Sequence, residues 1–131
     1  MLSILFRKKL PSDRRKLGRW GERWCERYLR RRGLKTLARN FSCKTGEIDL
    51  VMVDGDRTVV FVEVKTRVDE SFQPAESVIT TAKKAKMVRA ARYFLMPYNI
   101  EDRPFRFDVV TVIAGRGRRP EIRHYQRAFV P

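Results

Sequence analysis

The stretch Val59–Arg67, with the sequence VVFVEVKTR, decides the fold and also raises the question of function. Its β-branched and aromatic side chains predict a strand that is buried over at least its first half. Because side chains alternate along a strand, the valines at positions 60, 62 and 64 form one apolar face. The opposite face starts with Phe61 and continues with Glu63, Lys65 and Arg67. Charges in a half-buried strand are costly unless they are paired or bind an ion, so the charged residues on this face require an explanation.

A second apolar run, Ile48–Val53, contains Asp49 as its only charge, and the turn at Asp54–Arg57 predicts a hairpin between the two runs. The length of the hairpin loop decides whether Asp49 lies on the same face of the sheet as Glu63. A three-residue loop after Asp54 places Asp49 opposite Glu63 on one face, whereas a two-residue loop sends the two carboxylates to opposite faces. Both loop types contain glycine and are common, so the sequence leaves both registers open.

The rest of the chain predicts a single α/β domain with a mixed central sheet. Three successive strands indicate an antiparallel meander, and a later crossover helix indicates one parallel strand pair. The element order is helix-strand-strand-strand-helix-strand, with a further short strand at the end. The expected ranges are a helix at Arg14–Arg32, strands at Lys35–Phe41, Ile48–Val53 and Thr58–Arg67, a helix from Pro74 to just before Pro97, and strands at Phe105–Ile113 and Glu121–Gln126. We expect residues 14–131 to form the domain and residues 1–13 to form a flexible basic arm.

The charge balance predicts a polyanionic partner. The chain has 30 Lys and Arg against 15 Asp and Glu, a net charge of +15. Such an excess attracts nucleic acid first and acidic membrane surfaces second. No segment approaches the roughly 18 apolar residues that span a bilayer, so we expect no membrane insertion. Cys25 and Cys43 lack CxxC spacing and fit a reducing compartment, so the expected location is the cytoplasm.

Asp49, Glu63 and Lys65, if they converge, predict a hydrolytic site. Two close carboxylates repel each other and favour a divalent cation, and a few oxygen ligands suit Mg²⁺ or Mn²⁺. Lys65 would face the substrate of that ion, where an amine orients or deprotonates water or neutralises a phosphate oxygen. On a basic protein this set indicates phosphodiester hydrolysis. The simpler alternative is a structural pair between Glu63 and Lys65 near the sheet edge.

Asp49 followed by Glu63-x-Lys65 on adjacent strands resembles the PD-(D/E)xK motif of restriction-endonuclease-like nucleases. Over residues 18–129 the chain also looks like the YraN-like uncharacterised bacterial family. The motifs that carry this resemblance are Gly18-x-x-Gly21-Glu22-x-x-Cys25-x-x-Tyr28-Leu29, Arg39-Asn40, Gly46-Glu47-Ile48-Asp49-Leu50, Phe61–Arg67 and Arg106-Phe107-Asp108-Val109-Val110. The resemblance implies a restriction-endonuclease-like domain.

Site roles follow from this resemblance residue by residue. Asp49 and Glu63 would be metal ligands, with the Val64 carbonyl as an extra ligand, and Lys65 would be the catalytic lysine. Glu22 is similar to the first-helix glutamate that Holliday-junction-resolvase-like members add to the metal site; the alternative is a surface side chain in a frayed turn. Glu47 shares the face of Asp49 as a supporting or alternate ligand, or else faces water. Apart from the resemblance, the basic residues Arg67, Lys83, Lys84 and Lys86 would contact substrate phosphates; for Arg67 the alternative is a solvated strand end.

The predicted function is a Mg²⁺- or Mn²⁺-dependent nuclease that hydrolyses phosphodiester bonds in structured or single-stranded DNA. The alternative is a nucleic-acid-binding or assembly protein that keeps the fold with a silent site. DNA is favoured over RNA as the partner. Junction-resolving relatives are dimers, so a homodimer is compatible with the resemblance, although the sequence identifies no interface.

Overall fold

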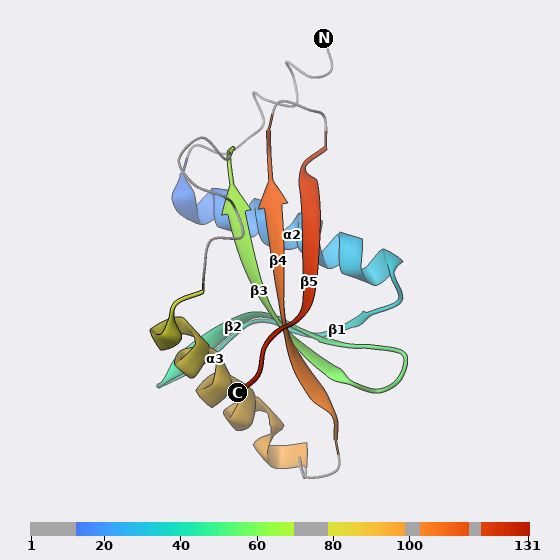
Figure 1. The fold of residues 1–131 in the computed structure, drawn as a ribbon, viewed down its shortest axis with the longest axis vertical. Helices are drawn as coiled ribbons and strands as arrows, with labels where there is room; N and C mark the ends of the chain where they lie inside the picture. The colour runs from blue at the N-terminus through green and yellow to red at the C-terminus, as the bar shows by residue number, and fades with distance from the viewer. Residues whose placement is uncertain (1–12, 70–78, 99–102, 116–118) are drawn as a thin grey trace.

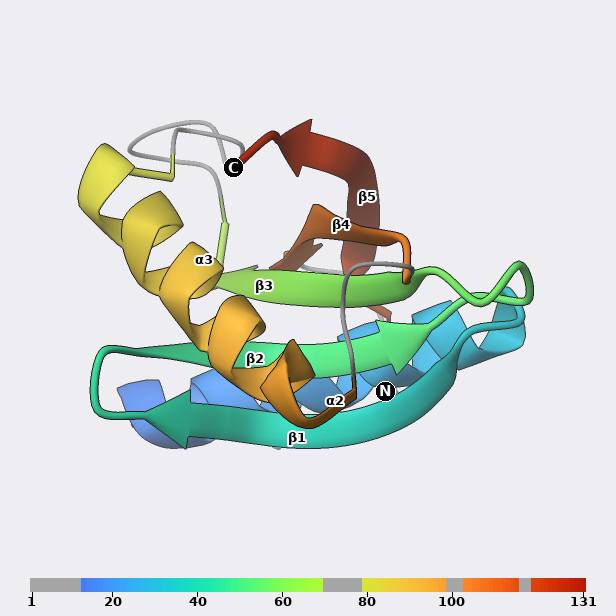
Figure 2. The same cartoon turned by 90° about the horizontal axis from the view of Figure 1, so that it is seen from below.

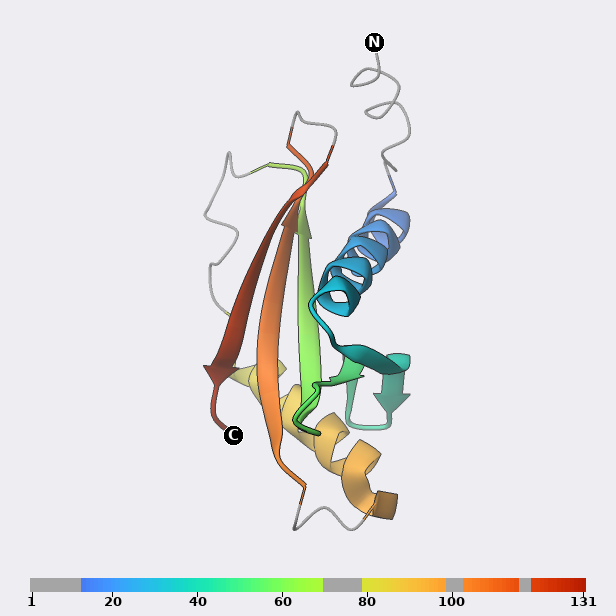
Figure 3. The same ribbon diagram turned by 90° about the vertical axis from the view of Figure 1, so that its right-hand side faces the viewer.

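A five-stranded mixed sheet forms the centre of the molecule, and one helix packs on each of its faces (Figures 1 and 3). The computed structural model describes residues 13–69, 79–98, 103–115 and 119–131. In spatial order the strands are β1 (Lys35–Cys43), β2 (Gly46–Val53), β3 (Val59–Arg67), β4 (Phe105–Ile113) and β5 (Glu121–Phe129). The helices are α2 (Arg14–Arg31) and α3 (Thr81–Leu95), and the short 3₁₀ helix η1 (Met96–Tyr98) follows α3.

The strand directions confirm the predicted α/β topology. β1, β2 and β3 are antiparallel neighbours, β3 and β4 are parallel, and β4 and β5 are antiparallel. The sheet is strongly twisted, since β3, β4 and β5 run nearly vertically in Figure 1 while β1 and β2 run across the view. Figure 2 shows α3 crossing in front of β2 and reaching β1, with α2 behind the same sheet. Strand β3 is therefore central, with a strand on each side and a helix on each face.

The two faces of β3 are divided as the alternation predicts. Val60 and Val62 belong to the core cluster under α2, together with Cys25 and Leu29 of that helix. Phe61 belongs to the other cluster, under α3. All of these side chains are completely buried. Burying each large aliphatic or aromatic side chain contributes roughly 1.5–3 kcal/mol, so the two helices hold β3 in place from both sides.

Helix α2 begins at the predicted residue and ends at Arg31, one residue before the predicted end, because local signals set both of its ends. The side chain of Asp13 accepts a hydrogen bond of 2.8 Å from the backbone N–H of Arg15, which satisfies one of the unpaired donors of the first turn. At the other end Gly33 has φ +98°, a left-handed conformation that glycine adopts without strain. No helix among the described residues is long and apolar enough to cross a membrane.

The predicted beginning of the second helix at Pro74 was wrong. Thr80 is extended, with ψ 158°, and its hydroxyl accepts from the backbone N–H of Lys83 at 3.1 Å, so α3 begins at Thr81. A threonine hydroxyl at this position satisfies a first-turn donor and ends the extended segment before it. Residues 70–78, which include Pro74, and nearly all of the predicted arm at 1–13 lie outside the described residues. Strands β1 and β5 extend two and three residues beyond their predicted ends.

The β2–β3 hairpin has the three-residue loop. Its register pairs Val53 with Val59 and Leu50 with Val62, which corresponds to a loop of residues 55–57. The loop closes with a hydrogen bond of 2.9 Å from Arg57 N–H to the Asp54 carbonyl, and Arg57 takes the left-handed position at φ +74°. Backbone pairing between β2 and β3 ends at Leu50, whereas β2 stays paired with β1 as far as Gly46. The two central strands therefore separate at Asp49.

Candidate functional site

Asp49 lies where β2 and β3 separate, and its carboxylate takes the place of the missing backbone partner. Asp49 Oδ2 accepts a hydrogen bond of 2.8 Å from the backbone N–H of Val64. Glu63, one residue earlier on β3, has a side chain that is only 13% exposed, and it shares a hydrogen bond with the Asp49 carboxylate. The structure thus brings these two predicted residues together.

The positive charges and hydrogen-bond donors around the two carboxyl groups do not fully compensate for the burial of two negative charges. Burial, followed by the negative charge of Asp49, raises the pKa of Glu63 to about 8. Burial also raises the pKa of Asp49, against the opposing effect of its hydrogen bonds from Val64 and Glu63. Near neutral pH the pair therefore shares a proton. A buried set of oxygen donors that retains a proton in this way is suited to a divalent cation, which would replace the proton.

A metal ion bound between Asp49 and Glu63 would have few protein ligands. Among the residues that the structure describes, no group of three or more His, Cys, Asp or Glu side chains is gathered closely enough to hold a metal ion. Asp49 and Glu63 would supply the carboxylates, and backbone carbonyl and water would complete the shell, as Mg²⁺ commonly accepts. The role of the Val64 carbonyl stays a prediction.

Glu22 comes from α2 and lies near Asp49 without joining a three-carboxylate set. It is half-buried, and Asn40 of β1 hydrogen-bonds to its side chain. Burial, and then the negative charge of Asp49, raises the pKa of Glu22 to about 7. The helix can come this close because of Gly21, where an added Cβ would overlap the side chain of Thr66 on β3. The frayed surface turn considered for Glu22 is therefore wrong.

Lys83 is predicted to contact substrate phosphate, but its ammonium lies beside the acidic pair. Its ammonium, from the first turn of α3, lies 3.6 Å from Glu63 Oε1 and 4.0 Å from Glu47 Oε1. The sequence offers several lysines at the start of α3, and no local signal separates Lys83 from its neighbours. Glu47 itself is 68% exposed and lies at the rim.

Lys65 lies two residues after Glu63 on β3 and therefore on the same face of that strand. Burial, and then the positive charge of Arg67, lowers the pKa of Lys65, while Glu63 opposes that shift. Arg67 is half-buried and its guanidinium donates to the carbonyl of Thr66 at 2.9 Å. Both predicted residues therefore lie in one row with Glu63, as the alternation requires.

The remaining predicted phosphate contacts divide between two hollows. Lys84 lines one with Lys65, over β4 and β5, and its ammonium lies 5.7 Å from the centre of the Phe129 ring. Lys86 lines the other with Glu47 and Lys83, beside the β1–β2 turn. The predicted cations therefore border two separate hollows instead of forming one patch.

Comparisons with known proteins identify relatives of the whole domain. Residues 21–112 match the family described as uncharacterised protein family UPF0102. A UPF0102 protein of Geotalea uraniireducens is 40% identical over 118 residues, which cover 90% of this chain and 92% of the relative. One of Pelotomaculum thermopropionicum is 40% identical over 121 residues, covering 92% of this chain and all of the relative. One of Nitrosomonas eutropha is 46% identical over 102 residues, covering 78% and 83%.

Proposed function

Because the chain belongs to the uncharacterised protein family UPF0102, whose name assigns no activity, we propose its function from the site itself. The protein is a metal-dependent nuclease that hydrolyses phosphodiester bonds in structured or single-stranded DNA. One observation carries the proposal: the Asp49 and Glu63 carboxyl groups are buried together at the point where two central strands separate, with Lys65 on the same face.

Each residue of the site has a chemical role in this proposal. Asp49 and Glu63, with the Val64 carbonyl, would hold Mg²⁺ or Mn²⁺. When bound, such an ion lowers the pKa of a coordinated water and neutralises charge on the scissile phosphate. Lys65 orients the attacking water or a phosphate oxygen through its N–H donors. Its lowered pKa also increases the fraction of neutral amine that can accept a proton.

The exposed face of α2 supports nucleic acid as the partner. Four exposed arginines follow one another at every fourth position on α2, namely Arg15, Arg19, Arg23 and Arg27. Residues four apart are neighbours on a helix surface, and like charges there destabilise the helix by about 0.2–0.5 kcal/mol per pair. Contact with a row of phosphates would offset that repulsion, and releasing counterions would make the affinity dependent on salt.

A second candidate is a nucleic-acid-binding protein with a silent site. The position of Lys83 favours it, because an ammonium 3.6 Å from Glu63 already supplies part of the counter-charge that a metal would supply. In that case the acidic pair would be a structural element of the sheet. Binding of nucleic acid would then be independent of both carboxylates.

The deciding experiment is a cleavage screen with Mg²⁺ and with Mn²⁺ over labelled single-stranded, duplex and branched DNA and the matching RNAs. We expect cleavage of at least one DNA substrate, and its loss in Asp49→Asn, Glu63→Gln and Lys65→Ala. Glu121→Gln is the matched control, because Glu121 is exposed on β5 and pairs with Arg123 at 2.6 Å. Unchanged binding with no cleavage under either metal would favour the silent-site alternative.

A further inference from the structure

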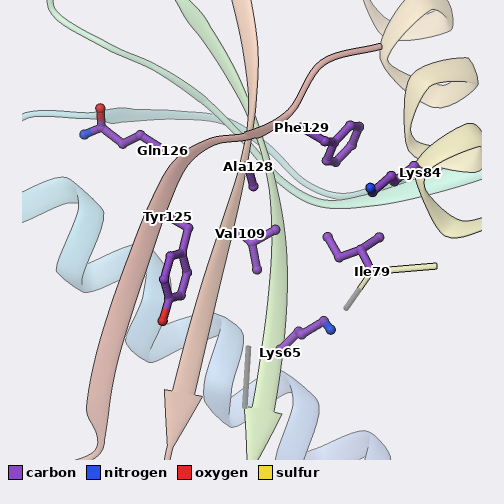
Figure 4. A pocket seen from close by; sticks show the side chains of 8 residues that line it. All are labelled: Lys65, Ile79, Lys84, Val109, Tyr125, Gln126, Ala128 and Phe129. Carbon is purple, nitrogen blue, oxygen red and sulfur yellow. The ribbon is translucent and has the colours of Figure 1, made fainter. Parts of the chain in front are cut away.

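A cavity of about 400 Å³ opens beside Lys65, on the α3 face of β4 and β5 (Figure 4). Its wall is mostly apolar, and two lysines stand at its border. The residues that line it are Lys65, Ile79, Lys84, Val109, Tyr125, Gln126, Ala128 and Phe129. In Figure 4 the Tyr125 and Phe129 rings lie on two sides of Val109, and the two ammonium groups lie on the side toward α3.

The strand register connects this cavity to the acidic pair. Glu63 is paired with Val109 on β4, and Val109 is paired with Tyr125 on β5. Paired residues on neighbouring strands point to the same face, about 5 Å apart per strand. The apolar cavity therefore begins one strand away from Glu63 and ends about two strands away. Lys65 lies at the junction, since it follows Glu63 on the same face and also lines the cavity.

The residues of the wall fit a largely apolar ring that is attached to an anion. Phe129 is held by stacking on Phe107, with ring centroids 4.8 Å apart and an angle of 17° between the planes. Tyr125 lines the cavity and is 36% exposed. The volume falls in the range of small-ligand sites, and aromatic side chains bind bases of any sequence through their faces. The ammonium groups of Lys65 and Lys84 complement the phosphate that such a ring carries.

We propose that this cavity holds an unpaired nucleobase next to the phosphate at Lys65, so that the protein selects single-stranded segments over continuous duplex. A base in a duplex is covered by its stacking neighbours and its pairing partner, and it can enter a cavity only after leaving both. The proposal rests on the proposed function for the position of the phosphate, and it narrows the substrate to DNA with unpaired nucleotides. The arginine face of α2 does not distinguish these substrates, because it contacts backbone charge alone.

The test measures binding without cleavage. Fluorescence anisotropy of a labelled oligothymidylate and of a duplex of equal length, both in EDTA, gives two affinities for each variant of the full chain. We expect tighter binding of the single strand by the natural protein. Tyr125→Ala weakens single-strand binding about tenfold, with duplex binding within twofold, because one stacked base is lost. Tyr125→Phe keeps the ring and the affinity, and Ala128→Trp fills the cavity and weakens single-strand binding as Tyr125→Ala does.

Tyr93→Ala is the matched control, since Tyr93 is a 56% exposed aromatic residue of α3 that does not line the cavity. Equal losses for both nucleic acids in Tyr125→Ala, or no loss for the single strand, would overturn the proposal, as would a natural protein that binds neither. If the protein binds single strands selectively but cleaves no substrate, the cavity assignment stands and the nuclease proposal is wrong. If the protein cleaves DNA but binds single strands and duplexes equally, the nuclease proposal stands and the cavity assignment is wrong.

Discussion

The ammonium of Lys83 lies 3.6 Å from Glu63 Oε1 and thereby supplies a positive charge beside the buried acidic pair. Lys83 lowers the pKa of Glu63, although burial and Asp49 raise it by more. An ammonium in this position both stabilises the metal-free protein and repels a divalent cation. The balance between those two effects can be measured.

Replacing Lys83 with methionine should tighten the binding of Mn²⁺. Removal of one positive charge a few ångströms from the site lowers the Kd about three- to tenfold, since surface-proximal charges interact by about 1 kcal/mol or more at this range. Isothermal titration calorimetry with MnCl₂ at pH 8 gives the value. Lys86→Met, on the same helix and outside the acidic pair, is the control. If Lys83→Met left the Kd for Mn²⁺ unchanged or raised it, Lys83 would not compete with the metal for the acidic pair.

The acidic pair should make the metal-free protein less stable as pH rises. A group whose pKa is higher in the folded protein contributes stability below its unfolded pKa and loses it as pH rises through the folded value. For Glu63 that window runs from 4.5 to about 8. Glu63→Gln keeps a donor toward Asp49 without the charge. At pH 8 it should therefore be more stable than the natural protein, by on the order of 2 kcal/mol.

Urea unfolding at pH 4.5 and pH 8 in EDTA tests this expectation. The two proteins should have the same free energy of unfolding at pH 4.5, and their curves should separate toward pH 8. Glu121→Gln, on an exposed side chain, should follow the natural protein at both values. A constant difference between Glu63→Gln and the natural protein would show that the charge of Glu63 is not its cause.

A divalent cation should restore the stability that is lost at pH 8. An ion that binds only the folded protein stabilises it by about 2.7 kcal/mol at a hundred times its Kd. For a domain of this size we expect the Tm to rise by about 5 °C or more in saturating MnCl₂. Asp49→Asn should abolish the rise, because it removes one of the two carboxylates. An equal rise in the natural protein and in Asp49→Asn would place the ion elsewhere.

Two glycines of α2 should respond to alanine in opposite directions. An added Cβ at Gly21 overlaps the Thr66 side chain, whereas one at Gly18 meets no atom within 4 Å. Gly18→Ala should stabilise the protein by up to about 1 kcal/mol through helix propensity. Gly21→Ala should destabilise it by about 1–3 kcal/mol, because α2 must move away from β3. Chemical denaturation compares them, and a stabilising Gly21→Ala would mean that the helix does not need this close approach.

Much of the fold could be predicted because its signals are local. Alternation along Val59–Arg67 assigns each side chain to a face, since the two-residue repeat of a strand follows from backbone geometry alone. The limits of α2 follow from Asp13 and Gly33, which act within a single turn. The beginning of α3 could not be read in the same way. Proline is favoured in a first helical turn, but that preference is weak and Thr80 provides the cap that the chain uses.

From the residues alone it follows that two carboxylates and a lysine lie on the two central strands, and that Glu63 and Lys65 share a face. The residues leave open whether Asp49 joins them, because two- and three-residue loops have comparable local free energies. That register is set by packing of both sheet faces against α2 and α3, which no local signal contains. The tertiary structure also selected Lys83 from the lysines of α3 and set Tyr125 in line with Glu63, since contacts between distant segments depend on how the whole sheet twists and pairs.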